Sequence, residues 1–103
     1  MPKEYRFLVP AAKHDTQAEH IHNHLCDIAG GYSRTSSDNL LFGCWIDPHG
    51  NCHRDYSIEY RVSILPDAEK PLIQFVETLC QRMSEQCIYF VLPTNSVLFI
   101  TPA

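Results

Sequence analysis

The fold is decided by residues 40–65, LLFGCWIDPHGNCHRDYSIEYRVSIL. Alternate positions in the second half of this stretch are apolar: Tyr56, Ile58, Tyr60, Val62 and Ile64. An apolar residue at every second position is typical of an antiparallel strand that buries one face. Residues 47–50, Asp-Pro-His-Gly, carry the residue types that a β-turn favours at its first, second and fourth positions. We therefore predict a hairpin, with one strand at residues 40–47 and the other at residues 56–65.

A helix is predicted before the hairpin, at residues 15–29. Thr16 and Glu19 have the S/T-x-x-E spacing of a capping box, in which each side chain bonds a free amide of the first turn. Apolar residues recur at helical spacing and form one stripe: Ala18, Ile21, Leu25 and Ile28. Gly30 and Gly31 are expected to end the helix, because glycine readily adopts the positive φ of a helix C-terminus. Residues 32–39 are polar and rich in serine, and we expect a loop there.

A second helix is predicted after the hairpin, beginning at Pro66 and Asp67. Pro71 is tolerated only in its first turn, because proline lacks the amide that later turns require. The apolar stripe of this helix contains Leu72, Phe75, Val76, Leu79 and Met83. Short strands are predicted at residues 5–9, 87–92 and 96–101, with a turn at residues 93–95.

These elements follow the order β-α-β-β-α-β, with a short extra strand at the C-terminal end. This is the split βαβ, or ferredoxin-like, order. Each helix has a single apolar stripe, so both helices are expected to cover the same face of an antiparallel sheet. We therefore predict one α+β domain over residues 1–103, a two-layer sandwich that leaves the second face of the sheet open.

Composition and charge narrow the class of protein. The net charge of −4 and the absence of any run of Lys or Arg argue against a nucleic-acid partner. The five cysteines are odd in number and form no C-x-x-C pair, so we expect reduced thiols in the cytoplasm. No signal peptide and no membrane-spanning run is predicted. A chain this short buries a limited core, which favours a homo-oligomer.

Several short motifs from Gly30 onward are shared with one group of proteins. They are Gly30-Gly31-Tyr32, Gly43-Cys44-Trp45-Ile46-Asp47 with Gly50, then Asp55, and Gln86-Cys87-Ile88-Tyr89. With them the chain resembles an uncharacterised bacterial family of small ferredoxin-like domains. The resemblance implies the architecture, and it implies no activity, cofactor or site residue. PII-type signalling proteins have a similar architecture, but their type of nucleotide-binding loop is not found in this sequence.

Two histidine groups are candidate metal ligands. His20 and His24 stand four residues apart, so they point to one face of the first helix and could chelate a metal together. His49, Cys52 and His53 lie in and after the hairpin turn, with Asp47 and Asp55 close by, and imidazole and thiolate are good ligands for zinc or copper. The alternative for the first group is a polar helix flank. The alternative for the second is an exposed turn, because neighbouring strand residues point to opposite faces.

The open face of the sheet is the third candidate site. Trp45 and Tyr89, together with Glu59 and Arg61, are expected to line a ligand pocket or a protein interface there. Aromatic residues and arginine are enriched among the residues that dominate binding energy at interfaces. Burial in a homodimer and contact with a different protein are both compatible with this composition.

The hypothesis that fits these features best is a small intracellular binding or regulatory module, such as a regulator or inhibitor. It would act through protein–protein contacts and self-associate. Two alternatives remain open. One is a metal-dependent or thiol-based small enzyme or sensor that uses a His/Cys cluster, with Cys52 beside His53 as the pair suggestive of nucleophilic chemistry. The other is a small-ligand sensor with a cleft between subunits. No cofactor is predicted, apart from a divalent metal in the first alternative.

Overall fold

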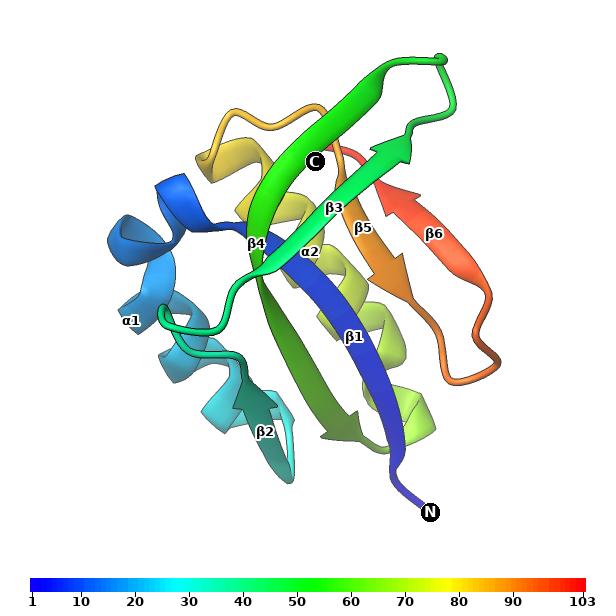
Figure 1. Ribbon diagram of the computed structural model, residues 1–103. Coiled ribbons are helices and arrows are strands. Elements are labelled where there is room, and N and C mark those ends of the chain that lie inside the picture. The colour runs from blue at the N-terminus through cyan, green and yellow to red at the C-terminus, as the bar shows by residue number, and fades with distance from the viewer.

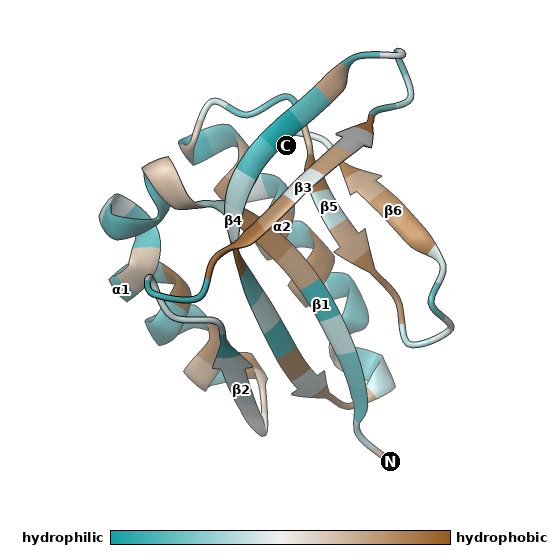
Figure 2. Ribbon diagram, viewed as in Figure 1, coloured by the Kyte–Doolittle hydropathy of each residue, from teal (hydrophilic) through white to brown (hydrophobic). Residues whose placement is uncertain are grey.

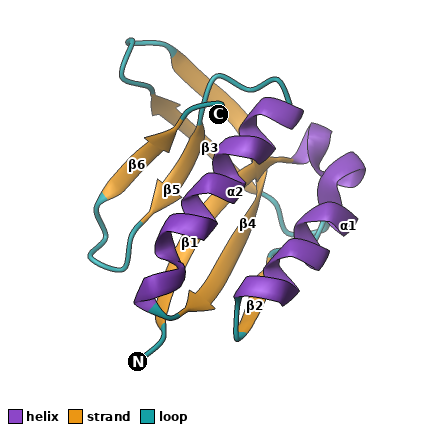
Figure 3. Cartoon of the chain, turned by 180° about the vertical axis from the view of Figure 1, so that it is seen from behind, coloured by secondary structure: helices purple, strands orange, loops and turns teal.

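The computed structural model describes residues 1–103 apart from the side chain of Trp45. Within the described residues, six strands form one antiparallel sheet, and two helices pack on one of its faces (Figure 1, Figure 3). The strands are β1 (Lys3–Pro10), β2 (Gly31–Arg34), β3 (Leu41–Ile46), β4 (Cys52–Ile64), β5 (Ile88–Val91) and β6 (Val97–Ile100). The helices are α1 (Ala11–Ile28) and α2 (Glu69–Arg82), and a short 3-10 turn, η1 (Pro66–Ala68), precedes α2. The predicted α+β class is confirmed. No helix within the described residues has the length and apolar character needed to cross a membrane.

The long strand β4 organises the sheet. The strand order is β2-β4-β1-β5-β6, and β3 also pairs with β4. Ser57 faces Pro10 of β1 on one side and Leu41 of β3 on the other, so β3 and β1 lie on opposite edges of β4. β2 pairs with the last residues of β4, on the same edge as β3. The first residues of β4 and β3 therefore form a two-stranded ribbon, the hairpin arm (residues 41–56), which extends beyond the rest of the sheet (Figure 1).

The core lies between the helices and the inner face of the sheet. The four apolar residues of β4 from Ile58 to Ile64 are all buried, as the alternation predicts. The ring of Phe7 stacks on that of Tyr60, with ring centroids 5.2 Å apart. The whole predicted stripe of α2 is also buried. Tyr56 is an exception, because it belongs to the hairpin arm, where no helix covers the sheet, and it is 55% exposed.

The structure corrects the predicted ends of α1. The helix begins at Ala11, directly after β1, and its first turn has no side-chain cap. The predicted capping box is wrong, because Thr16 lies inside the helix and donates a hydrogen bond to the Lys13 carbonyl (3.0 Å). The predicted glycine cap is also wrong. Ala29 ends the helix in an extended conformation, and neither following glycine has positive φ. The early start brings His14 and Gln17 into the core.

The predicted loop at residues 32–39 is wrong at its start, where β2 forms. The backbone of this segment pairs with β4, and its polar side chains are compatible with an edge strand. The Gly30 amide donates to the Ser63 carbonyl (3.1 Å), and the Thr35 amide donates to the Glu59 carbonyl (3.0 Å). The predicted hairpin turn is confirmed: the Gly50 amide donates to the Asp47 carbonyl (3.0 Å), and Gly50 has a φ of 85°.

Candidate functional site

A hollow of about 310 Å³ lies on the open face of the sheet, at the base of the hairpin arm. We call it the open-face hollow. It is lined by Leu8, Leu41, Phe42, Gly43, Cys44, Asp55, Ser57 and Tyr89. Four strands, β1, β3, β4 and β5, supply these residues, which come from distant parts of the sequence. Its volume is at the lower end of the range of small-molecule sites.

Gly43 and Asp55 face each other across the two strands of the arm, at the wall of this hollow. A Cβ atom added at Gly43 would meet nothing within 4 Å, so the space in front of the strand is open there. The carboxylate of Asp55 is exposed at the same place. The wall therefore presents one negative charge beside free space.

A smaller recess continues from the hollow. It shares Leu8, Asp55, Ser57 and Tyr89 with the hollow and adds His53, Glu85 and Cys87 among its lining residues. Tyr89 is half-buried, and its ring meets that of Phe99 edge to face, with centroids 6.0 Å apart. Together the hollow and the recess combine the aromatic ring of Tyr89, apolar leucines and the carboxylates of Asp55 and Glu85.

The charged residues predicted for the open face are paired with one another. Glu59 is 8% exposed, and Arg61 Nε donates to its Oε1 at 2.8 Å. Arg6 Nη1 lies 3.6 Å from Glu59 Oε2 on the other side. The carboxylate of Glu59 raises the pKa of Arg61. Of the predicted set, Tyr89 reaches the open-face hollow, Glu59 and Arg61 form an ion pair outside it, and the side chain of Trp45 lies outside the described residues.

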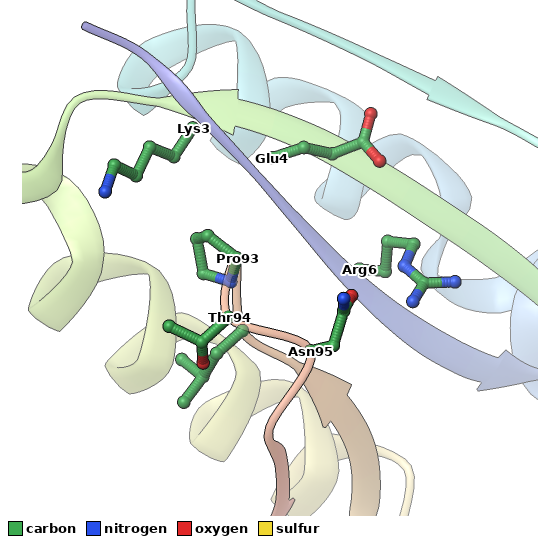
Figure 4. A pocket seen from close by; sticks show the side chains of 7 residues that line it. Lys3, Glu4, Arg6, Pro93, Thr94 and Asn95 are labelled. Carbon is green, nitrogen blue, oxygen red and sulfur yellow. The ribbon is translucent and has the colours of Figure 1, made fainter.

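A second hollow on the open face, of about 390 Å³, lies between β1 and the turn after β5 (Figure 4). Lys3, Glu4, Arg6 and Asn95 are among its lining residues. In Figure 4 the side chains of Lys3 and Arg6 point in different directions, so the two positive charges do not converge on one position. This hollow offers no defined set of ligand-binding groups.

A cluster of possible metal ligands lies at the turn end of the hairpin arm, beside the segment that precedes β5. One ligand atom each of Asp47, His53 and Cys87 lies within 4.8 Å of the others. A hydrogen bond of 2.8 Å joins His53 Nε2 to Asp47 Oδ2. The amides of His49 and Asn51 donate to Asp47 Oδ1 at 2.9 and 3.0 Å. The bond to His53 and these amides lower the pKa of Asp47 to about 2, and burial raises the pKa of the Cys87 thiol.

The structure does not bring His49, Cys52 and His53 together as the sequence predicted. His53 joins Asp47, whereas His49 is exposed in the turn and Cys52 lies 2.7 Å from the sulfur of Cys44. The strand register places Cys52 and His53 on opposite faces of the arm. Cys87 could not be identified from the sequence as a neighbour of Asp47, because the two residues are far apart in the chain and meet only through the fold.

His20 and His24 both pack on the ring of Phe75, between α1 and α2, with centroids 5.5 and 4.0 Å apart. In the described part of the chain, His20 Nε2 is buried and has no hydrogen-bond partner. Burial lowers the pKa of His20. The two rings therefore contribute to the helix–helix contact and face an aromatic side chain.

No protein-family model and no curated protein matches the sequence. A solved structure of a phage SAM lyase in complex with S-methyl-5′-thioadenosine is similar in fold. The superposition has a TM-score of 0.62 and 13% sequence identity, and it covers 97% of this chain and 89% of the other. The similarity extends over nearly the whole architecture, and at this identity it shows the fold alone.

Proposed function

We propose that this chain binds a small nucleoside of the S-adenosylmethionine type in the open-face hollow, and that it does so as a self-associating domain. The observation that carries this proposal is the wall of the hollow, where the Asp55 carboxylate stands beside the free space at Gly43. The phage SAM lyase, whose structure holds a thioether nucleoside, has a similar fold. That likeness suggests the ligand class.

The chemistry of the lining residues suits such a ligand. Leu8 and Leu41 offer apolar contact, and the ring of Tyr89 offers a face for an adenine base or a cation. S-Adenosylmethionine carries a positively charged sulfonium, which the carboxylate of Asp55 would attract. S-Methyl-5′-thioadenosine has a neutral thioether at the same position. We therefore expect Asp55 to favour the sulfonium over the thioether.

Calorimetric titration with each of the two compounds tests the binding. Replacing Asp55 with Asn is expected to weaken binding of the sulfonium by roughly fivefold, equal to about 1 kcal/mol for an exposed charge, and to leave the thioether nearly unchanged. Glu4→Gln is the matched control, because Glu4 is an exposed carboxylate that does not line the hollow. An equal effect of both substitutions, or no binding by the wild type, would contradict the proposal. Mass spectrometry of the titration mixture can also detect conversion of S-adenosylmethionine to S-methyl-5′-thioadenosine. Such conversion would extend the proposal from binding to a lyase reaction.

The self-association in this proposal uses the hairpin arm. Phe42, Ile46 and Tyr56 are exposed by 66%, 60% and 55%. Phe42 faces Tyr56 in the strand register, their ring centroids are 5.1 Å apart, and Ile46 shares their face of the arm. Figure 2 shows the apolar residues of β3 along this ribbon. Exposed apolar groups of this kind commonly mark a contact with another chain. Because β3 also borders the hollow, a second copy on the arm would place the hollow beside a cleft between subunits.

Light scattering over a range of protein concentrations tests this part. Phe42→Ser is expected to reduce the mass of the assembly toward that of one chain. Leu65→Ser is the control, since Leu65 is 52% exposed but lies at the other end of β4. A wild type that stays monomeric at high concentration would refute self-association. The chain would then act through contacts with a different protein, as a binding or regulatory module.

The ferredoxin-like topology is also part of the proposal. β2 and β3 pair along the same edge of β4, in the same direction, with a short irregular segment between them. If they are taken as one interrupted strand, the elements run β-α-β-β-α-β. β6 is then the extra C-terminal strand beside β5. We also propose a cytoplasmic location, which the expected reduced cysteines favour.

A second candidate function is a divalent-metal centre at Asp47, His53 and Cys87, favoured by the convergence of three ligand types within 4.8 Å. Carboxylate, imidazole and thiolate are all ligands of zinc, and the thiol would lose its proton on binding. Titration with Co²⁺ is expected to give the absorption of a thiolate-bound metal. Cys87→Ser should abolish that absorption and Cys26→Ser should not. A spectrum unaffected by loss of Cys87 would exclude this centre.

A further inference from the structure

Two exposed cysteines of the hairpin arm are in contact. The sulfur atoms of Cys44 in β3 and Cys52 in β4 are 2.7 Å apart. Cys44 faces Arg54 and Cys52 faces Ile46, so the two cysteines are diagonal neighbours on one face of the arm. Both side chains are open to solvent. A disulfide has a sulfur–sulfur distance of about 2.0 Å, so an approach of roughly 0.7 Å brings the two sulfurs to bonding distance.

The surroundings of this pair differ from those of the other three cysteines. The guanidinium of Arg54 interacts with both sulfurs and by itself lowers the pKa of Cys52, but the hydrogen bond to Cys44 and desolvation outweigh it, so the pKa of Cys52 is raised. Cys80 and Cys87 are buried, and burial raises the pKa of Cys80 to about 12. Cys26 is exposed, but its sulfur lies 3.7 Å from His22 Nε2. In the described chain, only the arm therefore combines solvent access, a second thiol in contact and an adjacent cation.

We propose that Cys44 and Cys52 are a modification site, at which a small-molecule disulfide such as glutathione disulfide converts two thiols into a reversible cross-strand disulfide. The thiolate of one cysteine attacks a sulfur of glutathione disulfide, which forms a mixed disulfide and releases one glutathione thiolate. The second cysteine, as thiolate, then attacks the protein sulfur of the mixed disulfide and releases the second glutathione. Two cysteine thiols are oxidised, and one glutathione disulfide is reduced to two glutathione thiols. Reduced glutathione reverses both steps, because the bond is exposed.

The position of the pair gives this modification a consequence. Cys44 is among the lining residues of the open-face hollow, and the side chains of both cysteines lie on the face of the arm that exposes Phe42 and Ile46. The bond would tie β3 to β4 next to both surfaces. This modification goes beyond the proposed function, because it requires neither a nucleoside nor a second copy of the chain.

The folded full-length chain is incubated with glutathione disulfide, its remaining thiols are alkylated, and it is digested with trypsin. Cleavage after Arg34 and Arg54 releases residues 35–54, which contain Cys44 and Cys52 and no other cysteine. The expected result is that this peptide loses two hydrogen atoms, takes no alkyl group, and regains both thiols with reductant. Cys26, on the peptide of residues 14–34, reports the reaction of an exposed cysteine without a thiol partner.

A Cys44→Ser variant completes the test. Its Cys52 has no second thiol in contact, so it should retain a glutathione adduct that the wild type resolves. The proposal is overturned if residues 35–54 stay alkylated at both cysteines while Cys26 has reacted. It is also overturned if the wild type retains the same glutathione adduct as the variant.

Discussion

The buried pair of His14 and Tyr60 offers a sharp test of how the helix layer is fixed to the sheet. The two side chains are 5% and 1% exposed, and Tyr60 Oη lies 2.6 Å from His14 Nε2. Burial raises the pKa of Tyr60 to about 12 and lowers the pKa of His14. At neutral pH the hydrogen bond therefore joins an uncharged phenol and a neutral imidazole. Tyr60→Phe keeps the ring that stacks on Phe7 but leaves His14 Nε2 buried without its hydrogen-bond partner.

A lost hydrogen bond that leaves a buried polar atom unsatisfied costs about 2 kcal/mol. For a chain of this size, that lowers the melting temperature by roughly 10 °C. Urea unfolding followed by circular dichroism measures the change. His14→Leu should cost a similar amount, and the double variant should cost less than the sum of the two, because no buried polar atom is then left unpaired. Additive losses in this cycle would refute the reasoning.

Three further predictions concern the rest of the fold. Burial lowers the pKa of both His14 and His20, so the unfolded chain binds protons at these residues before the folded chain does as pH falls below about 6.5. Urea unfolding should therefore show that stability declines below that pH, and that it declines less steeply in His14→Leu. An unchanged decline in the variant would contradict this assignment. Asp47 has a pKa of about 2, so its stabilising contribution is present above its ordinary value of about 4 and is lost as pH falls toward 2; acid unfolding of Asp47→Asn should lack that component, and identical acid profiles would argue against it. Gly50→Ala should cost about 1 kcal/mol in urea unfolding, because Gly50 has a φ of 85°. Thr16→Ala should change stability by less than about 0.5 kcal/mol, because Thr16 does not cap the helix. A larger loss in Thr16→Ala would support the capping box instead.

The parts of the fold that depend on apolar periodicity were predictable from the sequence. The stripe of α2 and the buried residues of β4 follow directly from spacing, because burial on one face selects apolar side chains there. β2 was not predictable in this way. It is an edge strand that pairs through its backbone, and Ser33 and Arg34 carry no signal for such pairing. The start of α1 was missed because the buried side chains of its first turns are polar.

The candidate site depends on strand register, which the sequence left undetermined. The Asp47 amide donates to the carbonyl of Asn51 (3.0 Å). A four-residue turn at residues 47–50 would instead pair Asp47 with Gly50, so the second strand is shifted by one residue relative to that expectation. A shift of one residue exchanges the faces of a strand. This register places Cys44 beside Cys52 and puts Gly43 opposite Asp55. The contributions of Leu8 and Tyr89 to the hollow also require the pairing of distant strands.

The most direct test of the proposed function is the binding of S-adenosylmethionine to the wild type and to Gly43→Val. Gly43 has an ordinary strand backbone, and an added Cβ meets nothing within 4 Å, so the variant is expected to fold normally. Its side chain would occupy the free space beside Asp55. We predict that the wild type binds and that the variant, with an unchanged circular dichroism spectrum and melting temperature, loses binding at least tenfold, equal to about 1.4 kcal/mol. Equal affinity in the two proteins would contradict the proposed site.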